Sequence, residues 1–374
     1  MSDFQFRDVF NPPLVNDLGD NLTRVWPPFQ RSAFVDAIVP QLSGLSFGDR
    51  NSLIADTLHA HLPDDFPVAA QILVDALGPE PDTDELSGFD GFIIMPQCLF
   101  VSRYGLDYPD EALHALYEMT KRFTAEGDIR PFIEKYPKKT MAFLDKLTQD
   151  PSPFARRLAS EGTRPRLPLS SRLPEFQRDP TPVIALLDKL KTDPNLMVRR
   201  SVANNLNDIA KDNPDVVVAT LERWQKDAPG KEMDWITSHA LRTLLKQGRP
   251  GALRLLGYDP AVNIAVSEIH LSNDHPAIGD EITFSFTVTS YADAPCALMI
   301  DYVIHFMKAN GKQAAKVFKA TKKTIAPGQT IPIERKHSFQ QRSTRKHYPG
   351  AHGVAVQING KKYSSVDFVL EDRE

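Results

Sequence analysis

Cysteine and long apolar runs are both scarce in this chain. Only two of its 374 residues are cysteines, Cys98 and Cys296, and they lie far apart. Two distant thiols make neither a disulfide framework nor a metal knuckle, which fits a reducing cytoplasm. No run of 18 or more apolar residues occurs, and the start, Met1-Ser2-Asp3-Phe4, lacks the basic and then apolar pattern of a secretory signal. We therefore expect a cytoplasmic protein with no membrane partner.

Cofactor-binding motifs are also missing. The sequence contains no G-x-x-x-x-G-K-[ST] loop, no G-x-G-x-x-G turn, no H-E-x-x-H helix and no cysteine-rich zinc spacing. His59 and His61 lie close together, but no third ligand accompanies them. We expect no metal and no cofactor.

Acidic residues are unevenly distributed. The chain holds 44 Lys and Arg against 48 Asp and Glu, and the net formal charge is −12 over residues 1–110, +5 over 111–262 and +3 over 263–374. Attraction of a polyanion depends on local potential within a Debye length, so the middle and C-terminal parts can attract a phosphate backbone. Charged faces that only keep a protein soluble produce the same distribution.

The periodicity of apolar residues divides the chain into two parts. A period of about 3.6 predicts an array of helix pairs up to residue 257, and a period of 2 predicts an antiparallel β-sandwich of immunoglobulin-like size over residues 262–371. Asn310-Gly311, Pro327-Gly328 and Asn359-Gly360 are turn dipeptides between the predicted strands. The predicted helices are 31–45, 50–61, 68–77, 110–125, 138–148, 182–191, 197–211, 214–227 and 234–247, and residues 79–90 form an acidic loop. The predicted strands are 266–271, 281–289, 297–307, 315–324, 331–339, 353–358 and 364–370.

One unit of the helical part is repeated. Asp150-Pro151 is answered about forty residues later by Asp193-Pro194, and Arg156-Arg157 by Arg199-Arg200. Stacked repeats of this length form a solenoid. Its concave side would carry the arginine pairs together with isolated acids, which favours a nucleic-acid enzyme.

A second repeated motif places carboxylates on the same face. A glutamate precedes glycine and then Arg-Pro in residues 125–131 and again in 160–165, so Glu126 and Glu161 lie 35 residues apart. Equivalent positions of neighbouring repeats point the same way, and Asp208 near the end of the next inner helix can join them. Isolated carboxylates are usually solvated surface, but their recurrence among arginines argues for a role.

Several segments resemble the AlkC branch of the HEAT-like-repeat DNA glycosylases, relatives of AlkD. These are Y-G-L-D (104–107), L-Y-E-M-T-K-R-F-T-A-E (116–126), I-R-P-F-I (129–133), R-R-L-A-S-E-G-T-R-P-R-L-P (156–168), V-R-R-S-V-A-N-N-L-N-D-I-A-K-D (198–212) and H-A-L-R-T-L-L-K (239–246). The β-rich C-terminus resembles the immunoglobulin-like domain of one subgroup. The resemblance implies an all-α HEAT-like repeat solenoid over residues 1–258, followed by an all-β immunoglobulin-like sandwich over 262–374.

The resemblance also implies an activity and a site. A member of this branch excises cationic alkylated bases, such as 3-methyladenine and 3-methylcytosine, by hydrolysing the N-glycosidic bond, without a deep pocket for the base. Its acidic cluster falls on Glu126, Glu161 and Asp208. Where many relatives read R-P-R-L-P-W, this chain ends the motif in Leu169, so an aromatic wall is missing.

The chemistry fits these residue types. An alkylated cationic base is already a good leaving group, and a carboxylate stabilises the positive sugar and accepts a proton from water. Arginine pairs would clamp phosphates. The expected partner is double-stranded DNA with alkylated bases, bound by a monomer in the bacterial cytoplasm at the nucleoid. The predicted DNA contacts are Arg156, Arg157, Arg164, Arg166, Arg199, Arg200, Asn204, Asn205, Trp235, Arg345 and Lys346.

Alternatives remain at this stage. A non-catalytic helical-repeat scaffold that binds nucleic acid or a protein is the other class of function. The second arginine of each pair would then pack along its repeat and bond the Asp of the Asp-Pro turn. Trp235 has the spacing of a core residue, although it could stack on a sugar or base. The basic loops of the β-domain either close over DNA or belong to a domain that only stabilises the last repeat.

Overall fold

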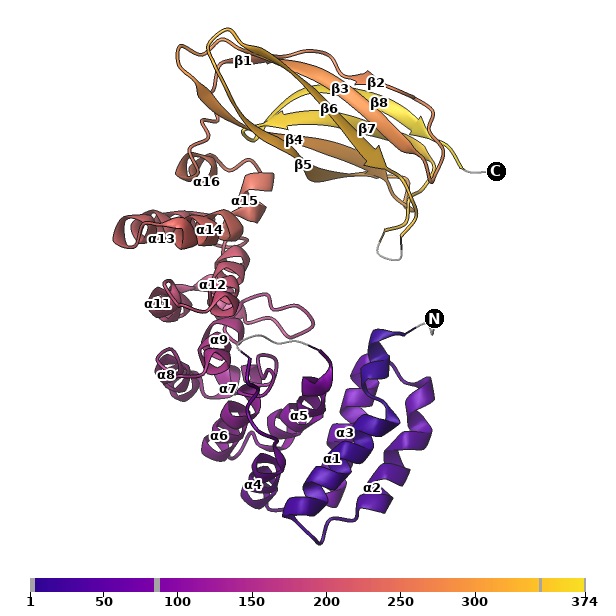
Figure 1. Cartoon of the computed structure of the whole chain (residues 1–374), viewed down its shortest axis with the longest axis vertical. Coiled ribbons are helices and arrows are strands. Elements are labelled where there is room, and N and C mark those ends of the chain that lie inside the picture. Colours follow the sequence, from indigo (N-terminus) through magenta and orange to yellow (C-terminus); the bar gives the residue numbers. More distant parts are fainter. Residues whose placement is uncertain (1–3, 84–87, 343–344, 373–374) are drawn as a thin grey trace. The chain divides into compact units, whose positions relative to one another are not determined.

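The computed structural model describes residues 4–83, 88–342 and 345–372 (Figure 1). The chain forms two compact units that divide between Ala240 and Leu241. Part of the predicted acidic loop, residues 84–87, and two residues of the basic loop, Ser343 and Thr344, lie outside the described residues. Among the described residues, no helix combines the length and apolar character needed to cross a bilayer.

The first unit is a stack of helices, as the 3.6-residue periodicity predicts. Helix α12 packs between α9 and α14 to form an inner row, and α8, α11 and α13 lie on the other side of this row (Figure 1). The elements are η1 (Phe6–Val9), α1 (Pro12–Val25), α2 (Arg31–Ile38), η2 (Val39–Gly44), α3 (Phe47–His61), α4 (Phe66–Ala76), η3 (Asp90–Ile94), α5 (Met95–Tyr104), α6 (Pro109–Thr120), α7 (Arg130–Lys135), α8 (Pro137–Leu147), α9 (Pro153–Glu161), α10 (Pro174–Arg178), α11 (Thr181–Leu190), α12 (Leu196–Ile209), α13 (Pro214–Asp227) and α14 (Lys231–Ala240).

Proline starts many of these helices. Pro109, Pro137, Pro153 and Pro214 each occupy the first helical position. The first helical N–H has no partner within the helix, and the fixed φ of proline suits this position. The prolines that break the periodic pattern in the sequence therefore mark helix boundaries.

Helices α5 and α9 lie outside the predicted helices, and so does α1, because the predicted helical pattern begins at residue 31. Helix α1 buries Val15, Leu18 and Leu22, which share one face. Asn11 caps it by accepting a hydrogen bond from the N–H of Leu14 at 3.0 Å. An Asn followed by two prolines and this apolar spacing were the signals available in the sequence.

The second unit contains a two-sheet sandwich, as the change of periodicity predicts. Strand β3 pairs with β1, β2 and β6 in one sheet, and the other sheet has the order β5-β4-β7-β8, with all these pairs antiparallel. The predicted strand 266–271 is instead two short strands. The strands are β1 (Ile264–Val266), β2 (His270–Leu271), β3 (Glu281–Ser290), β4 (Cys296–Met307), β5 (Gln313–Ile325), β6 (Thr330–Ser338), β7 (Gly350–Ile358) and β8 (Lys361–Leu370).

The hairpin between β7 and β8 confirms the Asn-Gly turn. Asn359 and Gly360 have φ values of 46° and 79°, and Ile358 pairs with Lys361 across this two-residue loop. Positive φ at both loop positions matches the right-handed twist of the strands. Local chemistry therefore determined this turn.

Two short helices group with the sandwich. They are α15 (Arg242–Lys246) and α16 (Pro250–Leu255). Gly248 approaches Gly360 so closely that an added Cβ on Gly248 would lie 2.6 Å from the carbonyl oxygen of Gly360. The Gln357 side chain donates to the carbonyl of Lys246 at 3.3 Å. The second compact unit therefore starts at residue 241, ahead of the residue 258 at which the sequence prediction ended the solenoid.

Candidate active site and nucleic-acid interface

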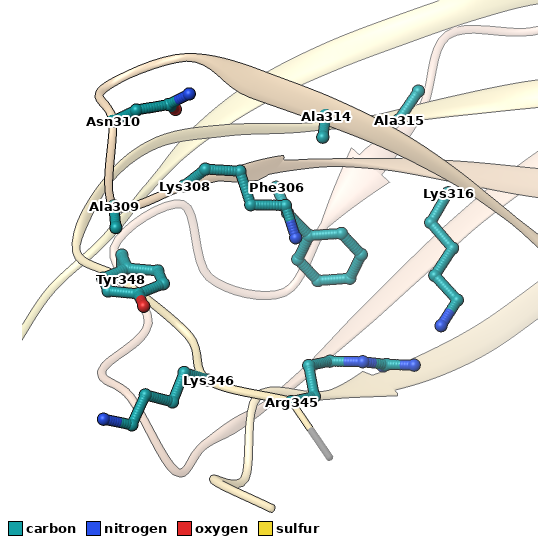
Figure 2. Close-up of a pocket in the computed structure, with 10 residues that line it drawn as sticks. All are labelled: Phe306, Lys308, Ala309, Asn310, Ala314, Ala315, Lys316, Arg345, Lys346 and Tyr348. Carbon is teal, nitrogen blue, oxygen red and sulfur yellow. The ribbon is translucent and has the colours of Figure 1, made fainter. Parts of the chain in front are cut away.

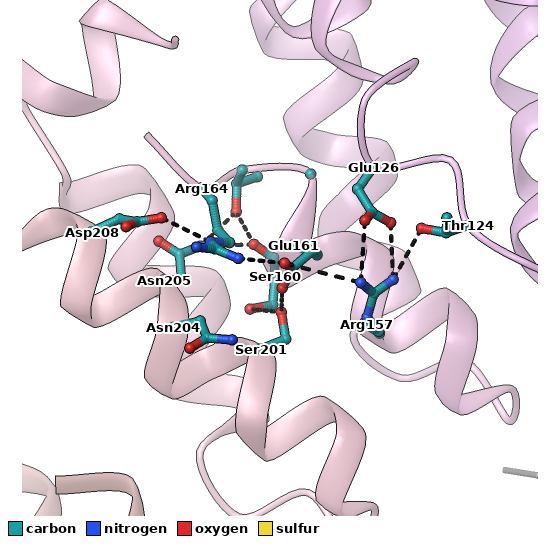
Figure 3. A network of polar contacts seen from close by, with 12 residues as sticks. Thr124, Glu126, Arg157, Ser160, Glu161, Arg164, Ser201, Asn204, Asn205 and Asp208 are labelled. Carbon is teal, nitrogen blue, oxygen red and sulfur yellow. Dashed lines mark hydrogen bonds and ion pairs between the residues drawn. The ribbon is translucent and has the colours of Figure 1, made fainter. Parts of the chain in front are cut away.

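The two predicted catalytic carboxylates share one guanidinium. Glu161 ends α9, and Asp208 lies in the last turn of α12. Arg164 donates from Nη1 to Glu161 Oε1 at 2.5 Å and from Nε to Asp208 Oδ2 at 2.8 Å (Figure 3). Glu161 is 6% exposed and Asp208 is 1% exposed. Stacking α9 on α12 therefore brings together two acids that are far apart in the sequence.

Further contacts hold each carboxylate. Ser201 Oγ donates to Glu161 Oε2 at 2.5 Å, and Lys211 Nζ lies 2.8 Å from Asp208 Oδ1. Burial disfavours the charged guanidinium of Arg164, but the carboxylates of Glu161 and Asp208 outweigh this effect and raise its pKa. The buried acids are thus compensated by cations on both sides.

Glu126 joins the same network through Arg157. Arg157 donates from Nη1 to Glu126 Oε2 at 2.9 Å and to Thr124 Oγ1 at 3.0 Å (Figure 3). Its Nη2 lies 4.0 Å from Glu161 Oε1. Acids and cations therefore alternate across the stack, in the order Glu126, Arg157, Glu161, Arg164, Asp208 and Lys211.

One of the three acids, Glu161, lines a small pocket. A cavity of about 230 Å³ is lined by Arg157, Glu161, Leu196, Met197, Arg200, Ser201 and Asn204. Asp208 and Glu126 do not line it. Glu161 is therefore the carboxylate placed to meet a ligand, and Asp208 lies behind it on the far side of Arg164.

Arg156 contacts protein where the sequence predicted a phosphate. Its Nε and Nη2 bind the carboxylate of Asp193 at 2.6 and 3.0 Å, and Nη1 donates to the carbonyls of Asp150 and Pro151. The side chain is 14% exposed. The alternative gave the Asp of the Asp-Pro turn to the second arginine of each pair, but the first arginine, Arg156, binds it here and links one repeat to the next.

Three other predicted DNA contacts also form ion pairs within the protein. Arg157 and Arg164 bind the acids of the network, and Arg166 binds both oxygens of Asp212 at 2.8 and 2.6 Å. These side chains are only 14%, 9% and 26% exposed. A guanidinium committed to a carboxylate has few donors left for a phosphate.

The second arginine pair differs from the first. Arg199 donates from Nη1 to the carbonyls of Asp193 and Pro194 at 2.7 and 2.8 Å. Arg200 is exposed, lines the pocket beside Glu161, and makes no hydrogen bond or ion pair with any residue that the structure describes. The exposed arginine beside Glu161 is therefore Arg200, from the second copy of the Arg-Arg motif.

The two asparagines have separate tasks. Asn205 is fully buried and donates from Nδ2 to the carbonyl of Ser160 at 2.7 Å, so its predicted DNA contact is wrong. Asn204 lines the pocket, and its Oδ1 lies 3.0 Å from His239 Nε2. A one-residue step along the helix separates a core position from a pocket position.

Trp235 is a surface residue, so its interpretation as core is wrong. Its ring is 37% exposed and stacks on His239, with centroids 4.9 Å apart and planes 12° apart. Because Asn204 contacts the same histidine, the ring lies near the pocket residues. A flat aromatic face at this position remains available for stacking.

The sequence prediction missed Arg130 as a site residue. This arginine is 0% exposed and donates from Nη1 to the carbonyls of Gly162 and Arg164 at 3.0 and 2.8 Å. Burial lowers its pKa to about 10. Arg130 thus fixes the turn from which Glu161 and Arg164 project. The repeated Arg-Pro dipeptide was the available signal.

Leu169 lies on the loop that follows this turn. Its φ of 59° is in the left-handed region, and its side chain is fully exposed. This conformation is costly for a residue with a Cβ other than Asn or Asp. The position at which the resemblance led us to expect an aromatic residue is therefore an outward-facing loop tip.

The second unit carries a basic pocket of about 640 Å³ (Figure 2). The predicted contacts Arg345 and Lys346 line it, with Lys308 and Lys316. The Arg345 guanidinium lies 5.6 Å from the ring centroid of Phe306, within the range of a cation–π contact. Four cations around one cavity fit an anionic ligand.

Comparison with known proteins shows the family. The chain is 36% identical to the structure of Pseudomonas fluorescens alkylpurine DNA glycosylase AlkC bound to DNA containing an abasic site analog, with a TM-score of 0.88 over 98% of this chain and 99% of that one. The chain belongs to the AlkC family. It is also 36% identical over 363 residues to the uncharacterized protein YhaZ of Bacillus subtilis (strain 168), covering 97% of this chain and 98% of YhaZ.

The AlkC-family likeness includes the sandwich. Residues 265–372 match the family described as "Uncharacterised protein YhaZ, C-terminal Ig-like domain". The immunoglobulin-like character that strand number suggested is thereby confirmed. The HEAT-like stack and the Ig-like domain form the AlkC-family fold in this chain.

Proposed function

We propose that this protein is a DNA glycosylase that excises cationic alkylated bases, including 3-methyladenine and 3-methylcytosine, by hydrolysing the N-glycosidic bond in double-stranded DNA. The observation that carries the proposal is the ionisable Glu161 in the wall of a small pocket, held by Ser201 and Arg164. The alkylpurine DNA glycosylase named in the comparison, 36% identical along nearly the whole chain, supports it. The protein would act as a monomer on the nucleoid.

Glu161 has the chemistry for the reacting sugar. As the bond to a cationic base lengthens, positive charge builds on the deoxyribose, and a carboxylate beside it stabilises that charge. The same carboxylate accepts a proton from the attacking water. Because the leaving base already carries positive charge, no general acid is needed. Asp208 acts as a positioning residue, since it reaches the pocket only through Arg164.

The size of the pocket agrees with this chemistry. Its volume of about 230 Å³ is smaller than the ~300–1,000 Å³ typical of sites that enclose a drug-sized ligand. We infer that the damaged base stays outside the pocket, and that the negative charge of Glu161 favours cationic over neutral bases.

Base release tests the proposal. Duplex DNA methylated by an alkylating agent is incubated with the full-length protein, and free bases are separated and quantified. We expect release of 3-methyladenine from this DNA and none from a duplex in which uracil is the only lesion, because uracil is neutral. Tight DNA binding without release of any methylated base would instead favour the non-catalytic scaffold.

A further inference from the structure

The inner row of helices contains three equivalent turns. Helices α9, α12 and α14 start at Pro153, Leu196 and Lys231, each three residues after the start of its turn. The first two turns begin with Asp-Pro, whereas the third begins with Ala228-Pro229. A carboxylate is therefore present at this position in two repeats and replaced by a methyl group in the third.

The preceding arginine shows what that carboxylate does. Arg156 uses Nη1 for the two carbonyls of its own turn, and it uses Nε and Nη2 to chelate Asp193 of the next turn. Arg199 repeats the first half of this arrangement with the carbonyls of Asp193 and Pro194. In residues 4–83, 88–342 and 345–372, no carboxylate pairs with Nε or Nη2 of Arg199. The residue at the equivalent partner position is Ala228.

A cavity lies where the carboxylate would be. Its volume is about 420 Å³, and Arg199, Ala228, Pro229 and Gly230 line it. Lys191 lines it as well and lies 3.2 Å from Asp227, so that its charge is partly compensated. Two acids also line the cavity: Asp193, whose carboxylate is bound by Arg156, and the exposed Glu232, which opposes an anion.

We propose that the Nε and Nη2 edge of Arg199 binds a phosphate of the DNA backbone, in the place that Asp193 occupies beside Arg156. This inference rests on the proposed function for its choice of ligand. A guanidinium edge matches two oxygens of a phosphate as well as those of a carboxylate. The carbonyls of Asp193 and Pro194 already hold the side chain, so binding immobilises little more of it. The small side chain of Ala228 leaves room for a ligand. An aspartate at position 228 would fill that room with its own carboxylate.

The substitution Ala228→Asp tests this site directly, because it restores the Asp-Pro turn and supplies an internal carboxylate. We expect the full-length variant to bind a short undamaged duplex about tenfold more weakly at low salt, the usual effect of losing a charged hydrogen bond. The slope of log affinity against log salt should fall by about 0.9, the value for one phosphate contact. The melting temperature should stay equal or rise, because a repeat-to-repeat ion pair is gained.

Two further variants complete the experiment. In Ala228→Asn the new side chain has nearly the size of aspartate but no charge. This variant should leave the salt slope close to that of the wild type. Arg199→Gln removes the charge from the other partner and should lower the slope as Ala228→Asp does. If Ala228→Asp fails to fold, the salt slope of Arg199→Gln tests the proposal in its place. Wild-type affinity and slope in a folded Ala228→Asp or Arg199→Gln protein overturn the proposal.

The readouts separate this site from the glycosylase activity. Undamaged DNA reports the phosphate contact alone, and release of methylated bases by the same proteins reports catalysis. A lowered slope with no base release by the wild type supports the site and rejects the enzyme. Inorganic phosphate at matched ionic strength is the second probe. If Ala228→Asp abolishes its binding without changing the affinity for DNA, the site takes free phosphate and the DNA contact is overturned.

Discussion

Glu161, Asp208 and Glu126 differ in their access to a ligand, although the sequence predicts the same acidic cluster for all three. Glu161 lines the pocket, Asp208 touches it only through Arg164, and Glu126 is separated from it by Arg157. Distance from the reacting sugar should therefore rank the effects of substitution. Replacing an acid by its amide tests this with little change in volume.

Glu161→Gln should lower the single-turnover rate of excision by about 10²-fold or more, because it removes a charge that stabilises the transition state. Asp208→Asn should lower the rate as well, and it should reduce stability by about 3 kcal/mol, since Arg164 and Lys211 lose a buried partner. Glu126→Gln is the matched control, with a smaller effect on rate. Affinity for DNA should change little. A protein that carries both Glu161→Gln and Asp208→Asn and still excises at the wild-type rate would contradict the catalytic role of these two acids.

Arg164 determines whether the acids can be buried together. Arg164→Met should destabilise the protein by about 3–5 kcal/mol, because Glu161 and Asp208 then lie buried without their shared cation. Arg166→Met is the control, since its pair with Asp212 is about one quarter exposed and such pairs contribute little, about 1 kcal/mol or less. Urea denaturation measures both. Equal losses in the two variants would show that Arg164 is not the compensating cation.

At the scale of elements, the sandwich buries a cluster of histidines. His337 on β6 and His352 on β7 surround Phe306 and Phe339, together with His347 from the preceding loop. Burial lowers the pKa of His337 to about 4, and the nearby cations Arg345 and Lys316 act in the same direction. Burial also lowers the pKa values of His347 and His352. The core is therefore built for neutral imidazoles.

The stability of the sandwich should depend on pH because of His337. Its pKa is lower in the folded state than the ordinary value near 6.5, so below about pH 6.5 the unfolded chain binds a proton that the folded one does not. Its contribution is fully present above that pH and is lost as the pH falls toward 4, at about 1.4 kcal/mol per pH unit. Hydrogen exchange of β6, corrected for its intrinsic rate, measures this loss.

The matched variant is His337→Phe, which keeps an aromatic ring among Phe306, Phe318 and Phe339 without a titrating nitrogen. Its exchange should depend less on pH between 6.5 and 4 than that of the wild type. His270→Gln, at an exposed position, should leave the dependence unchanged. A His337→Phe protein with the full wild-type pH dependence would show that other groups govern it.

At the scale of the whole molecule, the division at Ala240 and Leu241 decides how the chain can be cut. Residues 241–260 contact the sandwich at several points: Lys322 Nζ lies 5.4 Å from the ring centroid of Tyr258, and Asn359 donates to the carbonyl of Asp259 at 2.9 Å. A fragment of residues 1–260 would expose these surfaces, whereas one of residues 1–240 ends at the boundary of a compact unit.

We therefore expect the fragment 1–240 to melt cooperatively and the fragment 1–260 to aggregate or melt at a lower temperature. The proposal that the basic β-domain closes over bound DNA adds a second expectation. A tethered domain supplies a high effective concentration of cations, so residues 1–240 should bind damaged DNA and excise its alkylated bases far more weakly than the full chain at equal salt. Full affinity and full excision in a well-folded fragment would leave the sandwich a purely stabilising role.

The sequence by itself determined the features that depend on neighbours along the chain. The change from a period of 3.6 to 2 near residue 260, the proline-started helices, and the Asn359-Gly360 turn all follow from local backbone chemistry. Repetition of Asp-Pro, Glu-Gly and Arg-Pro indicated stacked units with acids on a common face. Helix α1 was not predicted, because Gly19 interrupts its apolar pattern.

Only the tertiary structure determines which arginines pair with a carboxylate of the next repeat. Arg156 and Asp193 lie 37 residues apart, Arg164 and Asp208 lie 44 residues apart, and each pair forms only when one helix stacks on the next. Spacing in the sequence places Arg156 and Arg199 on inner helices, but it does not say whether a guanidinium crosses to the next repeat or faces solvent. That choice depends on whether the next repeat offers a carboxylate within reach, as Asp193 does for Arg156 and Ala228 does not for Arg199.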